Sequence, residues 1–308
     1  TRKKLFGFCL VLPWIIGFVV FLLYPLSQTI LYSFSNVTIT PQGTETAPVG
    51  FKNYTDVLFT DPDFTLGIPT FLRQMVFMVP MIVVFSLLFA LLLNSHIRGQ
   101  RIYRAIFFLP VILISGPVLE RIRQVGATNL PGVDSFFVFQ FIYNQVPPVL
   151  SSPIQYIISN IVLIFWFSGV QVLIFLSGLQ KVDNSLYEAS MVDGASAWQR
   201  FWKITIPVVK PFILLIAVYT VVDIALSSLS PFTKVIQDGM FAPSKGFGFS
   251  SAASWLYFLF VLAALLLAFL VFGRKEKDPM RQKDKERRRA ARRAEKRHRQ
   301  AQREGLGA

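Results

Sequence analysis

Few side chains in this sequence have the types and spacing that catalysis or metal binding requires. The single cysteine, Cys9, can form neither an intrachain disulfide nor a cysteine metal site. The two histidines, His96 and His298, lie far apart in polar segments, so we expect neither a histidine metal site nor a catalytic triad. No Gly-x-x-x-x-Gly-Lys-Ser/Thr motif occurs, and no Gly-x-Gly-x-x-Gly follows a strand. The sequence therefore predicts a chain that is not an enzyme, has no metal site and holds no cofactor itself.

The clearest candidate for function is a carboxylate inside an apolar segment, Asp223. An ionisable residue at membrane depth marks a substrate or ion pathway by default. Polar residues share its face at helical spacing, and a second polar stripe with a nearby tryptophan runs along an earlier apolar segment. The candidate pathway residues are Asn160, Trp166, Ser168, Gln171, Thr220, Asp223 and Ser227.

Two interpretations of these stripes remain open. Neutral polar groups beside an aromatic ring suit a hydroxyl-rich solute such as a sugar. Alternatively, the same groups only form hydrogen bonds between helices, which contribute about 0.6 kcal/mol each.

The elements that must position these residues are long apolar segments, in a chain that is 53% hydrophobic. A helix rises 1.5 Å per residue, so about twenty apolar residues cross a hydrocarbon core of about 30 Å. The six segments run roughly over 5–34, 71–93, 103–119, 154–179, 208–230 and 250–272. They predict an all-α polytopic membrane protein with a transmembrane domain over 1–272 and a basic tail over 273–308. The first segment is too long for a signal peptide and lacks a cleavage site, so we expect a retained helix that bends at Pro13 and Gly17.

Lysine and arginine in the connections predict the orientation. The segments before residue 5, around 94–104, across 180–210 and after 273 hold three, three, four and fifteen of them. The alternate connections hold one, two and two. This bias places both termini in the cytoplasm, and six crossings require the same parity. We expect a multi-pass protein of a prokaryotic plasma membrane.

The net charge of +14 is concentrated in the tail. From Arg274 onward, 15 Lys/Arg stand against 6 Asp/Glu, a net charge of +9. No aromatic residues are interleaved for base stacking, so we favour binding to anionic lipid over binding to nucleic acid.

The predicted cytoplasmic connection over 181–207 carries helix-capping signals. Ser185 and Glu188 have the spacing of a capping box, so a short helix should begin after Ser185. Gly194 is placed to end that helix, because a residue with positive φ at this position suits glycine. Ser196 and Gln199 repeat the capping-box spacing and predict a second short helix that runs toward Ile204.

Two readings of this helix–turn–helix compete. Its second helix carries aromatic residues on one face, namely Trp198, Phe201 and Trp202. The first interpretation is that the segment is an amphipathic connector whose tryptophans lie at headgroup depth. That reading does not explain why two capped helices are joined by a glycine.

At this point the residues resemble a known family. Glu188-Ala189-Ser190, three residues, Gly194, nine residues and Ile204-x-Ile206-Pro207 are similar to the EAA loop of ABC importer permeases. The sequence departs from that pattern at Ser190 and Ile206. The segments Gly50–Tyr54, Arg104–Pro110 and Ile174–Gln180 are similar to the maltose and glycerol-phosphate type permeases. The resemblance runs from about residue 5 to residue 272, is weaker after Pro231 and excludes the basic tail.

The resemblance implies an ABC importer permease fold, with six transmembrane helices and a cytoplasmic coupling helix that docks on an ATPase. Its partners would be a second related permease, two ATPase subunits that bind ATP-Mg, and an extracytoplasmic solute-binding protein. This chain would form half of the translocation pathway, with a sugar or oligosaccharide as the expected solute. Carried over onto this sequence, the coupling positions are Glu188, Ala189, Ser190, Asp193 and Gly194.

Two other classes of protein fit the sequence less well. An ion-coupled secondary transporter would need coupling-ion sites at the bilayer midplane, and Asp223 has no obvious partner in the sequence. An intramembrane enzyme would need a catalytic set inside the apolar segments, and the sequence offers none there.

Overall fold

The computed structural model describes residues 2–41, 43–95 and 144–273, together with the isolated positions 102, 105, 121, 140 and 141. Its contacts divide the chain into Thr1–Phe272 and Gly273–Ala308. The description below concerns the first unit. The third predicted segment, 103–119, lies outside the described residues except for Ala105, and the basic tail also lies outside them.

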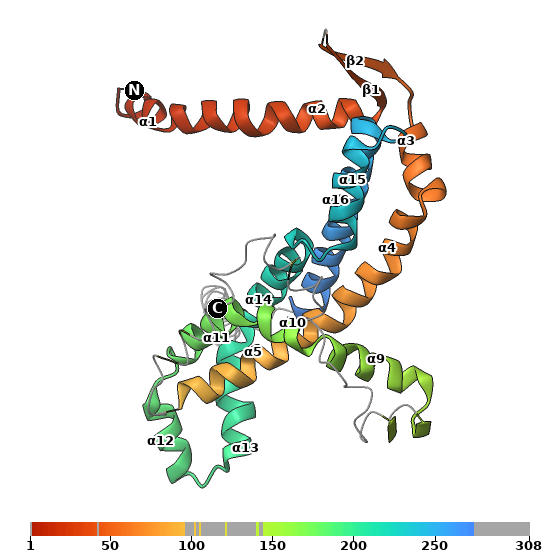
Figure 1. The fold of residues 1–308 in the computed structure, drawn as a ribbon. Coiled ribbons are helices and arrows are strands. Elements are labelled where there is room, and N and C mark those ends of the chain that lie inside the picture. The colour runs from red at the N-terminus through yellow and green to blue at the C-terminus, as the bar shows by residue number, and fades with distance from the viewer. Residues whose placement is uncertain are drawn as a thin grey trace, which may run out of the picture. The chain divides into compact units, whose positions relative to one another are not determined.

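The N-terminal span is one long helical run followed by a β-hairpin (Figure 1). Its elements are α1 (Arg2–Phe18), the π-helical turn η1 (Val19–Leu23), α2 (Tyr24–Ser33), β1 (Ser35–Thr40) and β2 (Gly43–Pro48). The two strands pair antiparallel, with Ser35 opposite Pro48 and Thr40 opposite Gly43. The connection between the first two predicted apolar segments thus holds a hairpin. β-branched side chains at Val37, Thr38, Ile39 and Thr40 favour extended backbone.

The second span begins earlier than its hydropathy predicts. The elements are α3 (Lys52–Thr55), η2 (Asp56–Thr60), α4 (Pro62–Arg73), η3 (Gln74–Met78) and α5 (Val79–Asn94). Helix α4 starts at Pro62 because the Asp61 carboxylate accepts a hydrogen bond from Phe64 N at 2.9 Å, and proline is well accommodated in the first turn. The helical run from Pro62 to Asn94 is 33 residues long, so the predicted start at residue 71 was wrong.

The fourth predicted segment is broken into three helices. They are α9 (Pro148–Ser159), α10 (Ile161–Phe167) and α11 (Gly169–Leu179). The chain bends by 60° between α9 and α10. Asn160 occupies the break, and its side-chain amide donates to Tyr156 O at 2.7 Å, which satisfies a carbonyl at the end of α9.

The remaining chain forms the predicted cytoplasmic connection over 181–207, here called the elbow, and two further membrane spans. Its elements are α12 (Asn184–Val192), α13 (Ala197–Arg200), η5 (Phe201–Thr205), α14 (Ile206–Leu226), α15 (Pro231–Phe241) and α16 (Gly246–Phe272). Helices α13, η5 and α14 follow one another without a gap, and Pro207, which has no N–H to donate, comes directly after the π-helical turn η5. The predicted second short helix therefore continues into the membrane span.

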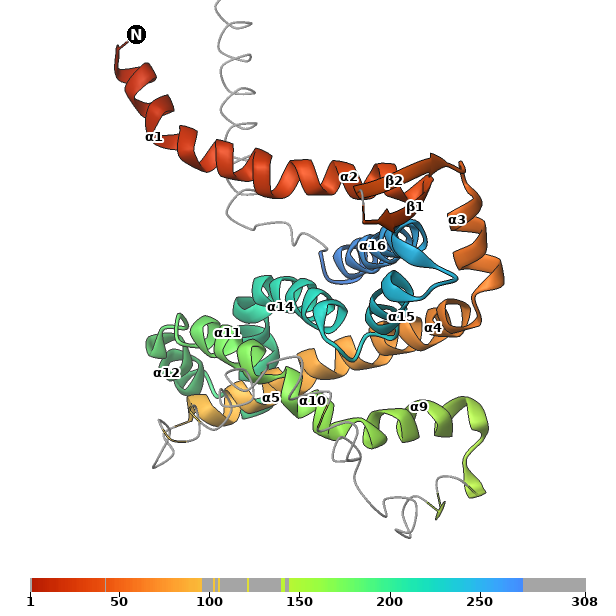
Figure 2. The same ribbon diagram turned by 45° about the horizontal axis from the view of Figure 1, so that its top comes forward.

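The core lies where α14 packs between α11, α5 and α16 (Figure 2). Its largest fully buried side chains include Phe64, Phe71, Phe175 and Phe232. The Phe232 ring packs against the Phe64 ring in a tilted arrangement with centroids 4.7 Å apart, which joins α15 to α4. Within the described residues, four helices are long and apolar enough to cross a membrane, or five if the bent pair is one span. The helical membrane fold is confirmed, and the count of six is compatible with these spans.

Candidate functional site

Helix α12 is the first half of the predicted coupling loop. Its N-cap is Asp183, whose carboxylate accepts from Ser185 N at 3.0 Å. The predicted cap at Ser185 was therefore wrong, because Asp caps as well as Ser and starting at Asn184 adds helical hydrogen bonds. The hydrogen bonds from the Ser185 amide and hydroxyl hold the pKa of the Asp183 carboxyl below its ordinary value.

The end of α12 confirms the role predicted for Gly194. Gly194 has φ of 75°, which a residue with a side chain rarely adopts. Its N–H donates to Met191 O at 3.0 Å, and Ala195 N donates to Ser190 O at 2.9 Å. These two bonds form a Schellman motif, which fixes the direction in which the chain leaves α12.

The capping box predicted for α13 is confirmed. Ser196 Oγ accepts from Gln199 N, and Gln199 Oε1 accepts from Ser196 N at 2.9 Å. Both turns of the elbow are thus built from residues within five positions of each other, so local sequence determines these two turns.

The coupling positions carried over from the family lie mostly on the outer surface of the elbow. Glu188, Ala189, Asp193 and Gly194 are exposed. Ser190 is half-buried, and its hydroxyl donates to Tyr187 O within the same helix. Val192, on the same side as Glu188 and Ala189, is 89% exposed, so nothing in the described part of the chain covers this side of α12.

The aromatic residues of the second helical piece contact one another. Trp198 and Trp202 lie with ring centroids 5.6 Å apart, and Phe201 lies 5.2 Å from Trp202. Trp198 and Trp202 are 69% and 50% exposed. The predicted shared face therefore exists, and it presents aromatic surface outward.

The two predicted polar stripes meet in the interior of the chain. Gln171 Nε2 donates to Thr220 Oγ1 at 3.2 Å, and both residues are fully buried. The Gln171 side chain also interacts with Asp223, which is half-buried. These three residues form a polar cluster between α11 and α14, here called the Gln171 cluster. Among the described residues, the Gln171 Oε1 atom has no hydrogen-bond partner.

The remaining pathway candidates do not join this cluster. Asn160 and Ser168 bond to carbonyls of their own helices, as does Ser227. Helix α14 ends at Leu226, so the expectation that Ser227 continues the helical stripe was wrong. Trp166 Nε1 is buried without a partner in the part of the chain that the structure describes.

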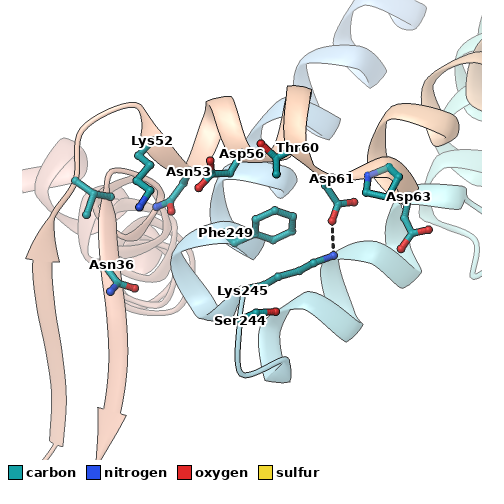
Figure 3. A pocket seen from close by; sticks show the side chains of 12 residues that line it. Asn36, Lys52, Asn53, Asp56, Thr60, Asp61, Asp63, Ser244, Lys245 and Phe249 are labelled. Carbon is teal, nitrogen blue, oxygen red and sulfur yellow. Dashed lines mark hydrogen bonds and ion pairs between the residues drawn. The ribbon is translucent and has the colours of Figure 1, made fainter.

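A polar cavity of about 640 Å³ lies near the start of α16, at the opposite end of α14 from the elbow. Lys245, in the connection before α16, forms an ion pair with Asp61 at the start of α4 (Figure 3). Lys245 Nζ also lies 5.0 Å from the centre of the Phe249 ring. Asp56 and Asp63 add carboxylates to the lining. No sequence pattern identified this cavity, because its ion pair joins residues 184 positions apart.

Comparisons with known proteins agree with this geometry. The chain is 28% identical over 289 residues to the probable ABC transporter permease protein YesP of Bacillus subtilis, covering 87% of this chain and 90% of that protein. It is 30% identical over 215 residues to the multiple sugar-binding transport system permease protein MsmF of Streptococcus mutans, covering 70% of this chain and 72% of that protein.

Solved structures share the fold. A bacterial ABC transporter involved in the import of the acidic polysaccharide alginate matches with a TM-score of 0.60 and 20% identity, covering 90% of this chain and 98% of that chain. The sequence profile described as binding-protein-dependent transport system inner membrane component matches residues 63–274. The alternative of an ion-coupled secondary transporter is not supported by these matches. The chain belongs to the family of inner membrane components of binding-protein-dependent transport systems, which are ABC transporter permeases.

Proposed function

We propose that this chain is one permease subunit of an ATP-driven importer, in which the α12 elbow docks on a separate ATPase subunit. The observation that carries the proposal is the elbow itself, an exposed helix fixed by caps at both ends and joined through Gly194 to a helix that enters the membrane as α14. An ATPase subunit that holds ATP-Mg supplies the energy. The chain itself supplies the mechanical connection.

The orientation follows from the charges of the connections. The elbow region and both terminal segments hold most of the lysine and arginine residues, which supports a cytoplasmic location for them. The cavity beside Asp61 and Lys245 then faces the extracytoplasmic side. That face is where a solute-binding protein would deliver its ligand, and binding proteins are a partner that the family description names.

The second permease subunit is proposed from uncovered apolar surface. An 18-residue apolar window within Leu10–Ser33 has no buried residue inside this chain, and only 6% of the corresponding window in Gly246–Phe272 is buried. Lipid and a second related permease would cover these helices. Two ATPase subunits would then dock on the two elbows of the pair.

The proposed solute is a sugar or oligosaccharide. The names of related proteins support this proposal, since they include permeases of transport systems for multiple sugars, arabinooligosaccharides and lactose. The Gln171 cluster supplies an amide, a hydroxyl and a carboxylate inside the membrane domain, groups that suit hydroxyl-rich ligands. Anionic lipid is the proposed partner of the basic tail.

The test is made on the reconstituted transporter with its partner subunits. Glu188→Lys inverts a charge on the outer face of α12, and Gly194→Val forces a branched side chain into left-handed backbone, which costs roughly 1–2 kcal/mol. We expect both variants to lose solute uptake while ATP hydrolysis by the ATPase subunits continues. Gly194→Asn tolerates positive φ better and should retain more uptake than Gly194→Val. Full uptake in both Glu188→Lys and Gly194→Val would contradict the docking role.

A further inference from the structure

Helix α12 is held to the membrane helices by a side chain that neither the family pattern nor the capping signals indicate. The Tyr187 hydroxyl and Thr205 Oγ1 lie 2.8 Å apart, which is an ordinary length for a hydrogen bond between hydroxyls. Tyr187 is half-buried and Thr205 is 4% exposed, so the bond is largely sheltered from water. Tyr187 and Ser190 are the only half-buried residues of α12, and the other residues of that helix are exposed.

The position of Tyr187 shows which face of α12 is attached to the rest of the chain and which face is exposed. At 3.6 residues per turn, Tyr187 lies on the side of the helix opposite to Glu188, Ala189 and Val192. Its side shares the half-buried Ser190, whereas the opposite side is exposed. One face of α12 is therefore free for a partner, and the other face is attached to the rest of the chain.

Thr205 lies where the elbow joins the membrane helix α14. It is the last residue of η5 and is followed directly by α14, whose buried residues include Thr220 of the Gln171 cluster. The covalent route from α12 to α14 passes through the turn at Gly194. A single turn allows α12 to pivot without displacing α14, whereas a second attachment transmits the displacement.

We propose that the Tyr187–Thr205 hydrogen bond is the strut that transmits movement of the elbow to α14, and that Tyr187 is a positioning residue for transport. The proposal rests on the proposed docking of α12. When the partner displaces the outer face of α12, the helix moves as a body because both of its ends are capped. The strut then carries that displacement past Gly194 to the cytoplasmic end of α14.

The experiment removes one hydroxyl at a time from the complete transporter. Tyr187→Phe keeps the ring, Thr205→Val keeps the shape, and Thr205→Ser keeps the hydroxyl. We expect Tyr187→Phe and Thr205→Val each to lower the number of solute molecules imported per ATP by about fivefold, since a neutral hydrogen bond contributes about 1 kcal/mol. The double variant should lose no more than either single variant, and Thr205→Ser should retain the ratio. Tyr24→Phe is the matched control, because Tyr24 is 63% exposed on α2.

Two readouts keep this test distinct from the test of docking. If Glu188→Lys abolishes uptake but Tyr187→Phe and Thr205→Val leave the import-to-ATP ratio unchanged, docking stands and the strut is overturned. A spin label on Val192→Cys, in a Cys9→Ser background of the full chain, reports α12 mobility without need of assembly. We expect Tyr187→Phe to increase the mobility of that label, and unchanged mobility would also overturn the strut.

Discussion

At the scale of single residues, the elbow depends on one exposed carboxylate. Asp183 caps α12, and hydrogen bonds from Ser185 hold the pKa of its carboxyl below the ordinary value. The native cap needs the ionised form, because only a carboxylate without its proton accepts these bonds fully. The cap therefore stabilises α12 at pH values above the ordinary pKa of aspartic acid, and this stabilisation is lost as the pH falls through the lowered pKa.

We predict that acidification in this range frays the first turn of α12. Faster amide hydrogen exchange at Ser185 and Leu186 would report the fraying. Asp183→Ala should show fast exchange at neutral pH already and no further pH dependence from this group, whereas Asp183→Asn should retain part of the protection. Equal protection in the native chain and Asp183→Ala would contradict the capping role.

A second residue-scale prediction concerns Gly248 in the first turn of α16. A Cβ atom at Gly248 would lie 2.2 Å from the Ser35 carbonyl oxygen, a backbone atom that no rotamer change can move away. The Asn53 amide donates to the same oxygen at 2.9 Å and to Ser33 O at 3.0 Å. Gly248→Ala should therefore lower stability by about 1–3 kcal/mol. Thermal unfolding in detergent measures this, with Gly17→Ala as the control, because a Cβ at Gly17 meets nothing within 4 Å.

At the scale of elements, the features that local sequence determines were predictable. The turn at Gly194 and the capping box at Ser196 need residues no more than five positions apart, so the local sequence predicted both. The apolar segments predicted the helices because their length alone reports the crossing of a bilayer. The start of α12 was placed two residues late, because Asp183 and Ser185 are both good N-caps and only one can be used.

Other features could not be predicted from the sequence, because they depend on contacts between residues that are separated in the chain or on the direction in which a helix runs. Hydropathy reports the length of an apolar run but not the direction of the helix axis, so the bend at Asn160 was not predicted. The hairpin left a weak signal in the β-branched run from Val37 to Thr40. The Asp61–Lys245 pair and the Tyr187–Thr205 bond join residues far apart in the chain, and no local pattern marks either pair.

The Gln171 cluster gives an element-scale prediction that separates packing from transport. Gln171 Oε1 is buried without a partner among the described residues, and Thr220 also bonds to Ile216 O at 2.7 Å. Gln171→Met removes an unsatisfied polar group and leaves Thr220 paired, but half-buried Asp223 loses the Gln171 amide, so stability should fall by about 1 kcal/mol. If the cluster lines the solute route, uptake by the folded variant should decrease as well. Unchanged uptake together with lowered stability would assign the cluster to helix packing alone.

At the scale of the whole molecule, the two ends of α14 have different proposed tasks. We propose that its elbow end receives movement from an ATPase subunit, whereas its other end approaches α16 through the bond from Tyr257 Oη to Ala225 O. The cavity at Asp61 and Lys245 lies beyond that second end. This arrangement functions as an importer only if the elbow lies on the cytoplasmic side of the membrane.

Labelling of Val192→Cys in the Cys9→Ser background tests that requirement directly, because Val192 is 89% exposed and Cys9 is the only native cysteine. A membrane-impermeant maleimide should modify the residue in inside-out vesicles and leave it unmodified in sealed right-side-out vesicles. Adding the ATPase subunit should slow the modification, since the subunit would cover the outer face of α12. Modification from the extracytoplasmic side would contradict the account, because no cytoplasmic ATPase could then contact the elbow.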